Sequence, residues 1–530
     1  MKESKPYYNK IDYKYYYNSI KIIINIIYMT ERTQSQKKLD ELLNLYLENV
    51  KGRNSSDGSL ELEVRFGTKG FRKLTYIDYT NVVKILKSLQ FRHLQQEDFL
   101  RITSEYVDPK TGVTKMSNIR TEVSGVGNIS KYCKSDNIVD TNGGVFGTFE
   151  QKTLIRNDDE SLVYPVDFED FNFRVSLQVE KKYNQSTGII RGIIDKWSNN
   201  KKTFRLINRT TLIHDKFPLK VDLSIVRSSR KINRNYVPEY RFTNSGVLES
   251  NMEYEIEIEL DGEKIGYGTD YDTPEKLASS LRKVIKYVLS GLQGTNYPVS
   301  YREQKDILNE YMNILWNEKK NHFVKPKNFV GPSSYTLQMY NIMPTEEINS
   351  PNINNNYTVT DKADGDRKLL YISSNNKIYL IDTNMNVQYT GAISDNDDLR
   401  GTIIDGEHIL HNKQGKFINL YAAFDIYYLK GEDVRSKQFI PTENVDDKTL
   451  LNYRLPLMVN IIGNINLKSI VKGEDVPIRI EKKTFYKSSV ESSIFEQCGL
   501  ILQKENDGLF EYNTDGLIFT PSLYAVGANN

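Results

Sequence analysis

The stretch that decides the fold is Glu253–Leu260, which reads EYEIEIEL. Side chains alternate between the two faces of a β-strand, so its four glutamates (Glu253, Glu255, Glu257 and Glu259) share one face and apolar or aromatic residues share the other. Aligned carboxylates repel one another unless cations intervene, and oxygen clusters of this kind suit Mg²⁺ or Mn²⁺. The strand therefore predicts an acidic, cation-binding face.

A second acidic strand lies far upstream, at Glu61–Phe66 (ELEVRF). Alternation places Glu61 and Glu63 on one face, although for this stretch taken alone an amphipathic strand with its acids in water is the favoured explanation. Further short alternating stretches lie between the two: SNIRTEV, FNFRVSLQVE, KTFRLINRTTLIH and PLKVDLSIV. Short strands separated by turn residues indicate a closed antiparallel barrel.

Four arginines occur inside these β-like, partly apolar runs: Arg120, Arg174, Arg205 and Arg209. Such positions are awkward for a guanidinium unless it points into a polar lumen. A barrel with acids on one side and basic residues on the other would hold a metal beside a polyphosphate.

The glutamate pair resembles the two motifs of the tunnel-type, metal-dependent RNA 5′-triphosphatases, and residues 60–260 resemble the first module of the mRNA-capping enzymes of large DNA viruses. This resemblance implies an eight-stranded antiparallel β-tunnel that acts on 5′-triphosphate RNA with Mg²⁺ or Mn²⁺. It implies that Glu61, Glu63, Glu255 and Glu257 are catalytic metal ligands. Of the other two acids of the second strand, Glu259 is favoured over Glu253 as a further ligand because it lies deeper in the apolar run. The arginines that would clamp the triphosphate are Arg120, Arg174, Arg205 and Arg209.

Bulk composition describes a water-soluble chain of several domains: 530 residues, 71 Lys and Arg against 69 Asp and Glu, and 38% hydrophobic residues. This near balance excludes a uniformly basic surface for nucleic acid. Two distant cysteines, Cys133 and Cys498, form no disulfide framework and favour a reducing compartment. No apolar run is long enough to span a bilayer, so no membrane association is expected.

Domain boundaries are predicted where the residue composition and the pattern of apolar residues change along the chain. Residues 1–28 are a low-complexity tail of mostly Lys, Asn, Ile and Tyr, and Met29 starts an ordinary amphipathic segment. Residues 29–325 form the predicted tunnel domain with flanking helices, one of them capped by Thr273 and another at 301–316. A basic segment at 319–329 is the predicted linker, and residues 326–530 form a mixed α+β domain.

The second domain contains Asp361–Arg367, DKADGDR. A nucleophilic lysine must lose its proton near neutral pH, which requires enclosure and basic neighbours, and Lys362 follows a β-like run and precedes Arg367 and Lys368. A charged hairpin turn is the alternative. Three later stretches argue against it, because each places a carboxylate at an apolar strand: DGE at 405–407, FDI at 424–426 and TDGLIF at 514–519.

In this order, the four motifs resemble the covalent nucleotidyltransferases, which include mRNA guanylyltransferases and ATP- or NAD-dependent ligases. The resemblance implies a phosphoramidate link between Lys362 and GMP, with GTP as substrate. It implies nucleotide contacts from Asp364, Gly365, Arg367, Glu407, Phe424 and Asp515. A guanylyltransferase is favoured over a ligase because a triphosphatase makes the 5′-diphosphate end that accepts GMP.

The family's K-x-K motif, OB fold and methyltransferase have no counterpart here, so the second domain is expected to be incomplete and GMP transfer by this chain alone is in doubt. The alternatives are an ATP-dependent polynucleotide ligase and a non-catalytic binding subunit. A polypeptide that supplies the missing parts is an expected partner.

The expected location is the host cytoplasm, a viral factory or the virion, since abundant Asn, Ile, Lys and Tyr suggest an AT-rich viral genome.

Overall fold

The computed structural model describes residues 34–50, 58–68, 72–108, 110–157, 159–318, 323–345, 351–489 and 492–527. The predicted tail, residues 1–28, lies outside them. The chain divides between Gly294 and Thr295 into two compact units, which are described separately below.

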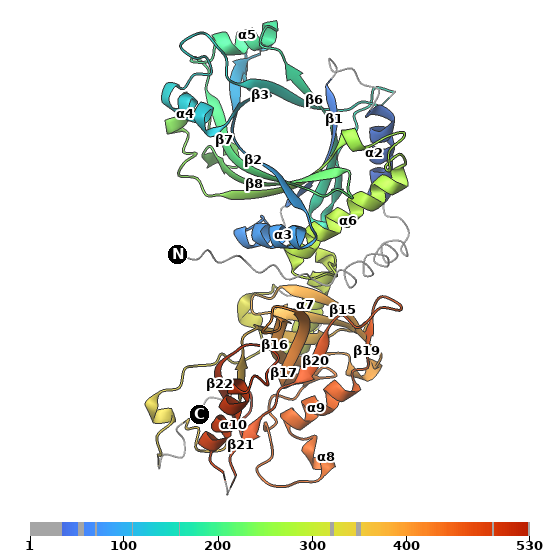
Figure 1. The fold of residues 1–530 in the computed structure, drawn as a ribbon, viewed down its shortest axis with the longest axis vertical. Helices are drawn as coiled ribbons and strands as arrows, with labels where there is room; N and C mark the ends of the chain where they lie inside the picture. Colours follow the sequence, from blue (N-terminus) through green and yellow to red (C-terminus); the bar gives the residue numbers. More distant parts are fainter. Residues whose placement is uncertain are drawn as a thin grey trace. The chain divides into compact units, whose positions relative to one another are not determined.

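The N-terminal unit is built on eight antiparallel strands that close into a ring (Figure 1). Their order around the ring is β1, β11, β8, β7, β2, β3, β4, β6, and β6 pairs again with β1. The bounds are β1 Ser59–Phe66, β2 Arg92–Val107, β3 Thr114–Ser124, β4 Thr148–Leu154, β6 Phe173–Tyr183, β7 Lys202–Ile213, β8 Leu219–Ser228 and β11 Glu253–Leu260. Short strands β5 (Val166–Phe168), β9 (Lys231–Ile232) and β10 (Asn235–Tyr236) lie outside the ring. The predicted eight-stranded antiparallel tunnel is confirmed.

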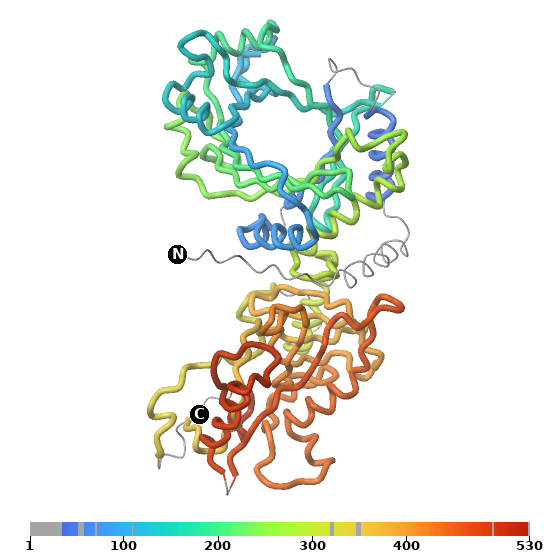
Figure 2. Tube along the Cα trace, viewed as in Figure 1, coloured from blue at the N-terminus to red at the C-terminus, as the bar shows by residue number. Residues whose placement is uncertain are grey.

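Most apolar residues of the strands face outward and most charged residues face inward, as the alternation predicted; Phe99, Ile207 and Val226 form a small apolar cluster on the inward face. The outer face packs beneath helices α2 (Gln34–Asn49), α3 (Tyr76–Ser88), α4 (Val126–Ser135), α5 (Gly188–Asp195) and α6 (Pro274–Gln293), which the Cα trace in Figure 2 shows around the ring. The cluster near α4 and α5, for example, buries Tyr132, Trp197 and Phe204. Because the apolar core lies outside the ring, the lumen can remain polar.

Helix α6 begins as predicted: the Thr273 side chain accepts a hydrogen bond from the Lys276 amide, and Pro274 occupies the first turn. At Gly291 the helix meets α3 so closely that a Cβ would lie 2.7 Å from Val82 Cα. Only glycine permits this approach, which seats α6 against α3 and helps to brace the barrel wall.

The C-terminal unit contains two sheets. The smaller one joins β12 (Tyr357–Ala363) to β22 (Thr514–Pro521) and β21 (Tyr486–Lys487). The larger one runs β18 (Glu432–Asp433), β17 (Phe417–Leu429), β16 (Thr402–His411), β13 (Asp366–Ile372), β14 (Lys377–Asp382), β15 (Val387–Ser394) and β19 (Leu467–Ser469), with β20 (Arg479–Lys482) parallel to β17. The helices of this unit are α7 (Tyr301–Trp316), α8 (Asp447–Leu450), α9 (Arg454–Asn464) and α10 (Ile494–Asn506). This is the mixed α+β domain that the sequence predicted.

Helix α7 is part of the C-terminal unit, whereas the predicted boundary at 325/326 placed it with the tunnel. Its buried residues Ile307, Tyr311 and Met312 pack in one cluster with the inner strands of the larger sheet. The Tyr311 hydroxyl donates to Asn328 O at 2.8 Å and accepts from the Val330 amide at 2.9 Å. The basic segment predicted as the linker therefore follows an element that already belongs to the second unit. No helix in the described part of the chain is long and apolar enough to cross a membrane.

Candidate functional sites

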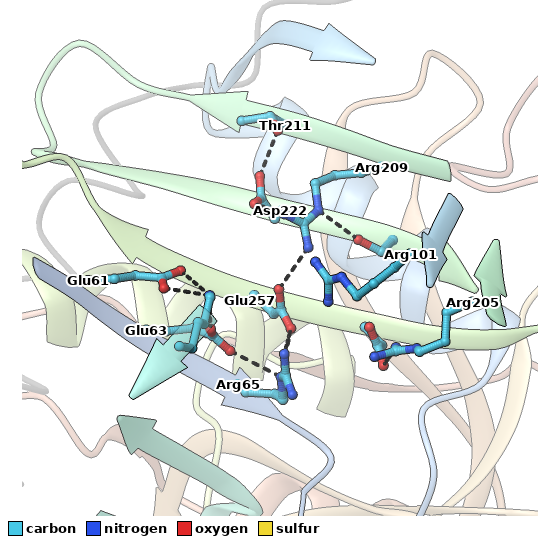
Figure 3. A network of polar contacts seen from close by, with 12 residues as sticks. Glu61, Glu63, Arg65, Arg101, Arg205, Arg209, Thr211, Asp222 and Glu257 are labelled. Carbon is cyan, nitrogen blue, oxygen red and sulfur yellow. Dashed lines mark hydrogen bonds and ion pairs between the residues drawn. The ribbon is translucent and has the colours of Figure 1, made fainter. Parts of the chain in front are cut away.

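The tunnel lumen brings the glutamates of β1 and β11 together (Figure 3). The strands are adjacent and antiparallel, with Glu63 directly opposite Glu259 and Arg65 opposite Glu257. Opposite residues share a face, so Glu61, Glu63, Glu257 and Glu259 all point inward. The alternation that aligned the glutamates in the sequence therefore forms one acidic wall.

Basic side chains from both walls neutralise part of this charge. Arg65 Nε lies 2.6 Å from Glu257 Oε1 and 3.1 Å from Glu63 Oε1. Lys152, on β4, reaches across to Glu61 at 2.5 Å and Glu63 at 3.5 Å. Neither cation was predicted, although the alternation of ELEVRF already placed Arg65 on the glutamate face.

The four predicted arginines all pair with acids. Arg205 contacts Glu255 at 2.6 Å, and Arg209 contacts Glu257 at 3.1 Å. Arg120 contacts Glu180 at 2.6 Å and Glu150 at 3.2 Å, and Arg174 contacts Asp167 at 2.8 Å. Their role as triphosphate clamps stays a prediction. In that role, each guanidinium would release its carboxylate to bind a phosphate oxygen, or bind both at once.

Glu255 and Glu259 occupy different surroundings on β11. Glu255 lies beyond Glu257, next to Arg205, whereas Glu259 faces Glu63 and forms no ion pair within the described part of the chain. Burial, followed by the charges of Glu61 and Asp222, raises the pKa of Glu259 to about 7. Burial and Glu257 likewise raise the pKa of Glu63. The register thus favours Glu259 over Glu255 as the partner of the β1 carboxylates.

Glu253, the remaining acid of β11, lies at the end of the strand. Lys73 and Lys231 contact it at 3.2 Å and 3.3 Å. Burial opposes ionisation, but these two lysines leave the pKa of Glu253 below its usual value. The side chain is therefore already neutralised at the rim of the tunnel, away from the carboxylates of β1.

The donor set of the acidic wall fits a hard divalent cation, because every donor is a carboxylate oxygen. Within the described ranges, however, no three His, Cys, Asp or Glu side chains converge closely enough to hold a metal ion as they stand. The reason is visible in the ion pairs, since Lys152 and Arg65 occupy the space between the carboxylates. The raised pKa values of Glu63 and Glu259 indicate a demand for further positive charge at this point.

In the C-terminal unit, a break in strand pairing brings Lys362 and Asp515 together. Asp361 pairs with Leu517 and Ala363 with Thr514, so one residue of β12 lies opposite two residues of β22. The extra residue is accommodated at Gly516, whose φ of 141° lies in the region that favours glycine. Lys362 Nζ thereby lies 2.7 Å and 2.6 Å from the two carboxylate oxygens of Asp515.

A second lysine, Lys483, lies beside the first and was not predicted. It is 5% exposed, and its Nζ lies 3.1 Å from Asp361 Oδ2. Burial lowers the pKa of Lys483 despite the opposing charge of Asp361. Burial also raises the pKa of Glu407 to about 7, and the nearby Lys483 opposes this shift. Lys483 follows an ordinary amphipathic strand in a lysine-rich stretch, so nothing in a single sequence distinguishes it.

The basic neighbours expected for Lys362 are engaged elsewhere. Arg367 pairs with the fully buried Asp405, its Nε lying 3.2 Å from Asp405 Oδ1, and it donates to Pro332 O at 2.7 Å. Lys368 is buried and contacts His408 Nδ1 at 2.9 Å. The side chain of Lys362 is 46% exposed, so the expected enclosure is not observed either. Lys483 is the basic neighbour instead.

The remaining predicted nucleotide contacts surround this pair. Phe424 falls at a pairing irregularity of β17, where Asp405 pairs with Asp425 and Gly406 with Ala423, and its ring lies 5.9 Å from the Arg367 guanidinium. Asp364 is exposed, and its amide donates to Asn513 O at 2.8 Å. A Cβ on Gly365 would lie 2.8 Å from Glu407 Cγ, so glycine is required beside Glu407.

The chain combines a closed eight-stranded tunnel lined with charged residues and an α+β unit in which a β-bulge positions Lys362. Comparison with known proteins relates both features to mRNA capping. Residues 301–530 match the family described as mRNA capping enzyme, catalytic domain. The chain is 26% identical over 479 residues to the probable mRNA-capping enzyme of Acanthamoeba polyphaga mimivirus, covering 85% of this chain and 35% of that protein. The expected resemblance to the N-terminal part of viral mRNA-capping enzymes is thereby confirmed.

Solved structures with similarity to this chain include two RNA triphosphatases. The triphosphatase of the mimivirus capping enzyme has a TM-score of 0.27 and 15% identity, covering 48% of this chain and 96% of its own. The S. pombe Pct1 RNA triphosphatase has a TM-score of 0.28 and 13% identity, covering 50% and 96%. The strand order described above, rather than these scores, carries the fold assignment.

Proposed function

We propose that the chain acts in mRNA 5′-capping, and that the tunnel hydrolyses the γ-phosphate of 5′-triphosphate RNA. The observation that carries this proposal is the pairing of Glu63 with Glu259 across β1 and β11, inside a lumen whose other walls are rich in arginine. Glu61, Glu63 and Glu259 would hold Mg²⁺ or Mn²⁺, with Glu257 beside them. The bound ion would neutralise γ-phosphate charge and provide a water-derived nucleophile.

The residues of the lumen have separable tasks. Arg209 and Arg120 lie on walls that flank the acids, where they can share their carboxylates with phosphate oxygens and stabilise charge on the leaving diphosphate. Lys152 bridges Glu61 and Glu63 and neutralises part of their charge when no stronger cation is present. Closure of the barrel fixes all these groups on strands, which limits their motion.

For the second unit, we propose that Lys362 accepts GMP. Its Nζ attacks the α-phosphorus of GTP, a P–N bond forms, the bond to the bridging oxygen breaks and pyrophosphate leaves. The Lys362 ammonium first gives one proton to Asp515, the carboxylate 2.6 Å away, so that the neutral amine attacks; the second proton, lost from the nitrogen as the P–N bond forms, leaves with the pyrophosphate. A 5′-diphosphate RNA end, the product of the tunnel reaction, then takes GMP from the lysine.

Incubation with α-labelled GTP or ATP, followed by denaturing electrophoresis, tests this assignment. Label from GTP should remain on the wild-type chain and be absent from Lys362→Ala, while Lys368→Ala serves as the matched lysine control. Label from ATP and not GTP would show the ligase alternative to be right. A chain that takes label from neither nucleotide would favour the binding-subunit alternative.

The chain spans 35% of the length of its curated mimivirus relative, so partners remain part of the proposal. A polypeptide with OB-fold and methyltransferase functions would complete the cap. We propose the host cytoplasm or a viral factory as the location; this is supported by the free state of Cys133 and Cys498, which suits a reducing compartment.

A further inference from the structure

One mouth of the tunnel carries a cavity of about 450 Å³. Its floor is formed by the inward-facing residues Arg101, Thr103, Thr203 and Arg205 of β2 and β7. Met116 of β3 and the hairpin residues Asn235 and Tyr236 complete the lining. The hairpin β9–β10 follows β8 directly, so it stands at the end where β2 ends and β7 begins.

The lining combines charge with an aromatic and a thioether surface. Arg101 pairs with Glu122 at 2.7 Å and Arg205 with Glu255 at 2.6 Å, yet the buried Nε of Arg205 has no hydrogen-bond partner among the described residues. Burial lowers the pKa of Arg101 against the pull of Glu122, and the guanidiniums of Arg120 and Arg205 add to this effect. Clustered guanidiniums of this kind favour an anion beside them.

The cavity and the acidic wall are connected along β11. Glu255, the partner of Arg205, and Glu259, the partner of Glu63 in the register, are four residues apart, which corresponds to roughly 13 Å of strand. A triphosphate with its γ-phosphate at Glu259 and its other phosphates along β11 toward Glu255 would extend its nucleoside toward Arg205. The cavity volume also falls in the range of roughly 300–1,000 Å³ that small-molecule sites occupy.

We propose that this cavity receives the 5′-terminal nucleoside of the RNA, with its base against Tyr236 and Met116 and its α-phosphate at Arg101 and Arg205, so that RNA enters the tunnel through the mouth that bears the β9–β10 hairpin. The inference rests on the proposed triphosphatase function. The exposed basic residues Lys110 and Arg234 at the same mouth are placed to meet the following RNA phosphates.

The test compares two ligands that share a triphosphate and differ in the nucleoside. Binding of a short 3′-fluorescein RNA with a 5′-triphosphate end is measured in EDTA by anisotropy, and binding of inorganic tripolyphosphate by its competition with that RNA. Release of phosphate from each is then measured with Mg²⁺ or Mn²⁺. The variants are Tyr236→Ala, Tyr236→Phe and the control Tyr267→Ala, an exposed tyrosine that follows the other end of β11.

Tyr236→Ala should raise the Kd and KM for RNA roughly tenfold, as loss of one base–aromatic stack does, and leave tripolyphosphate unchanged. Tyr236→Phe should restore RNA binding, and Tyr267→Ala should change neither ligand. Equal weakening of RNA and tripolyphosphate, or no effect on RNA, would overturn the entry proposal. Selective loss of RNA binding in a chain that hydrolyses neither ligand would uphold the cavity and reject the triphosphatase.

Discussion

The protonation of Glu259 in the lumen can be measured through the pH dependence of the free energy of unfolding. Burial, Glu61 and Asp222 raise its pKa to about 7, from an ordinary value of 4.5. Between these two pH values the folded chain retains a proton that the unfolded chain releases, so the free energy of unfolding falls as pH rises, by about 1.4 kcal/mol per pH unit. The penalty is absent below pH 4.5 and reaches roughly 3 kcal/mol above pH 7.

Glu259→Gln removes this penalty, so the metal-free variant should match the wild type near pH 4.5 and exceed it by about 3 kcal/mol near pH 8. The two tryptophans allow the assay to follow the tunnel alone. Trp197 is buried in the tunnel unit and Trp316 is 56% exposed on α7, so urea unfolding in a Trp316→Phe background reports on the tunnel through Trp197.

A stability difference between Glu259→Gln and the wild type that does not change with pH would refute this reasoning. Glu253→Gln is a control of opposite sign. Although burial opposes ionisation, Lys73 and Lys231 hold the pKa of Glu253 below its ordinary value. Its ion pairs therefore contribute stability above the unfolded pKa that is lost as pH falls, and Glu253→Gln should destabilise the chain near pH 8 and converge with the wild type in acid.

Two predictions concern the C-terminal unit. Arg367→Leu leaves the fully buried Asp405 without its cation and should lower the free energy of unfolding by about 3–5 kcal/mol in urea titrations; a loss under 1 kcal/mol would contradict this pairing. Gly406→Ala places a Cβ 2.6 Å from the Tyr421 ring and should cost about 2 kcal/mol, whereas Gly463→Ala on α9 meets open space and should change stability by less than 1 kcal/mol. Equal effects of these two glycine substitutions would contradict the close packing at Gly406.

Alternation made the acidic wall predictable, because a period of two specifies which side chains share a face whatever the tertiary context. The same rule would have included Arg65. Two barrel strands lack a clear alternation of apolar and polar residues and were not predicted. Strand β2 begins with six exposed residues, and β4 (TFEQKTL) is mostly polar. Their polar faces line a charged lumen or meet water, so hydrophobic periodicity is weak there.

The geometry at Lys362 depends on pairing irregularities that local sequence does not specify. The motif order predicted that Asp515 lies near the nucleotide site, but only the β12–β22 register places it against Lys362. Lys483 reaches the same place through a strand parallel to β17, a long-range pairing with no local signature. Helix α7 was assigned to the wrong side of the boundary because a basic, proline-containing segment resembles a linker even where it follows a packed helix.

The most direct test of the account is release of γ-phosphate from 5′-[γ-³²P]triphosphate RNA by the full chain, with Mg²⁺ or Mn²⁺ and with EDTA. We expect metal-dependent release that Glu63→Gln and Glu259→Gln each abolish and that Lys362→Ala leaves unchanged. Release that persists in both glutamine variants, or that needs no divalent ion, would contradict the assignment of the tunnel as a metal-dependent triphosphatase.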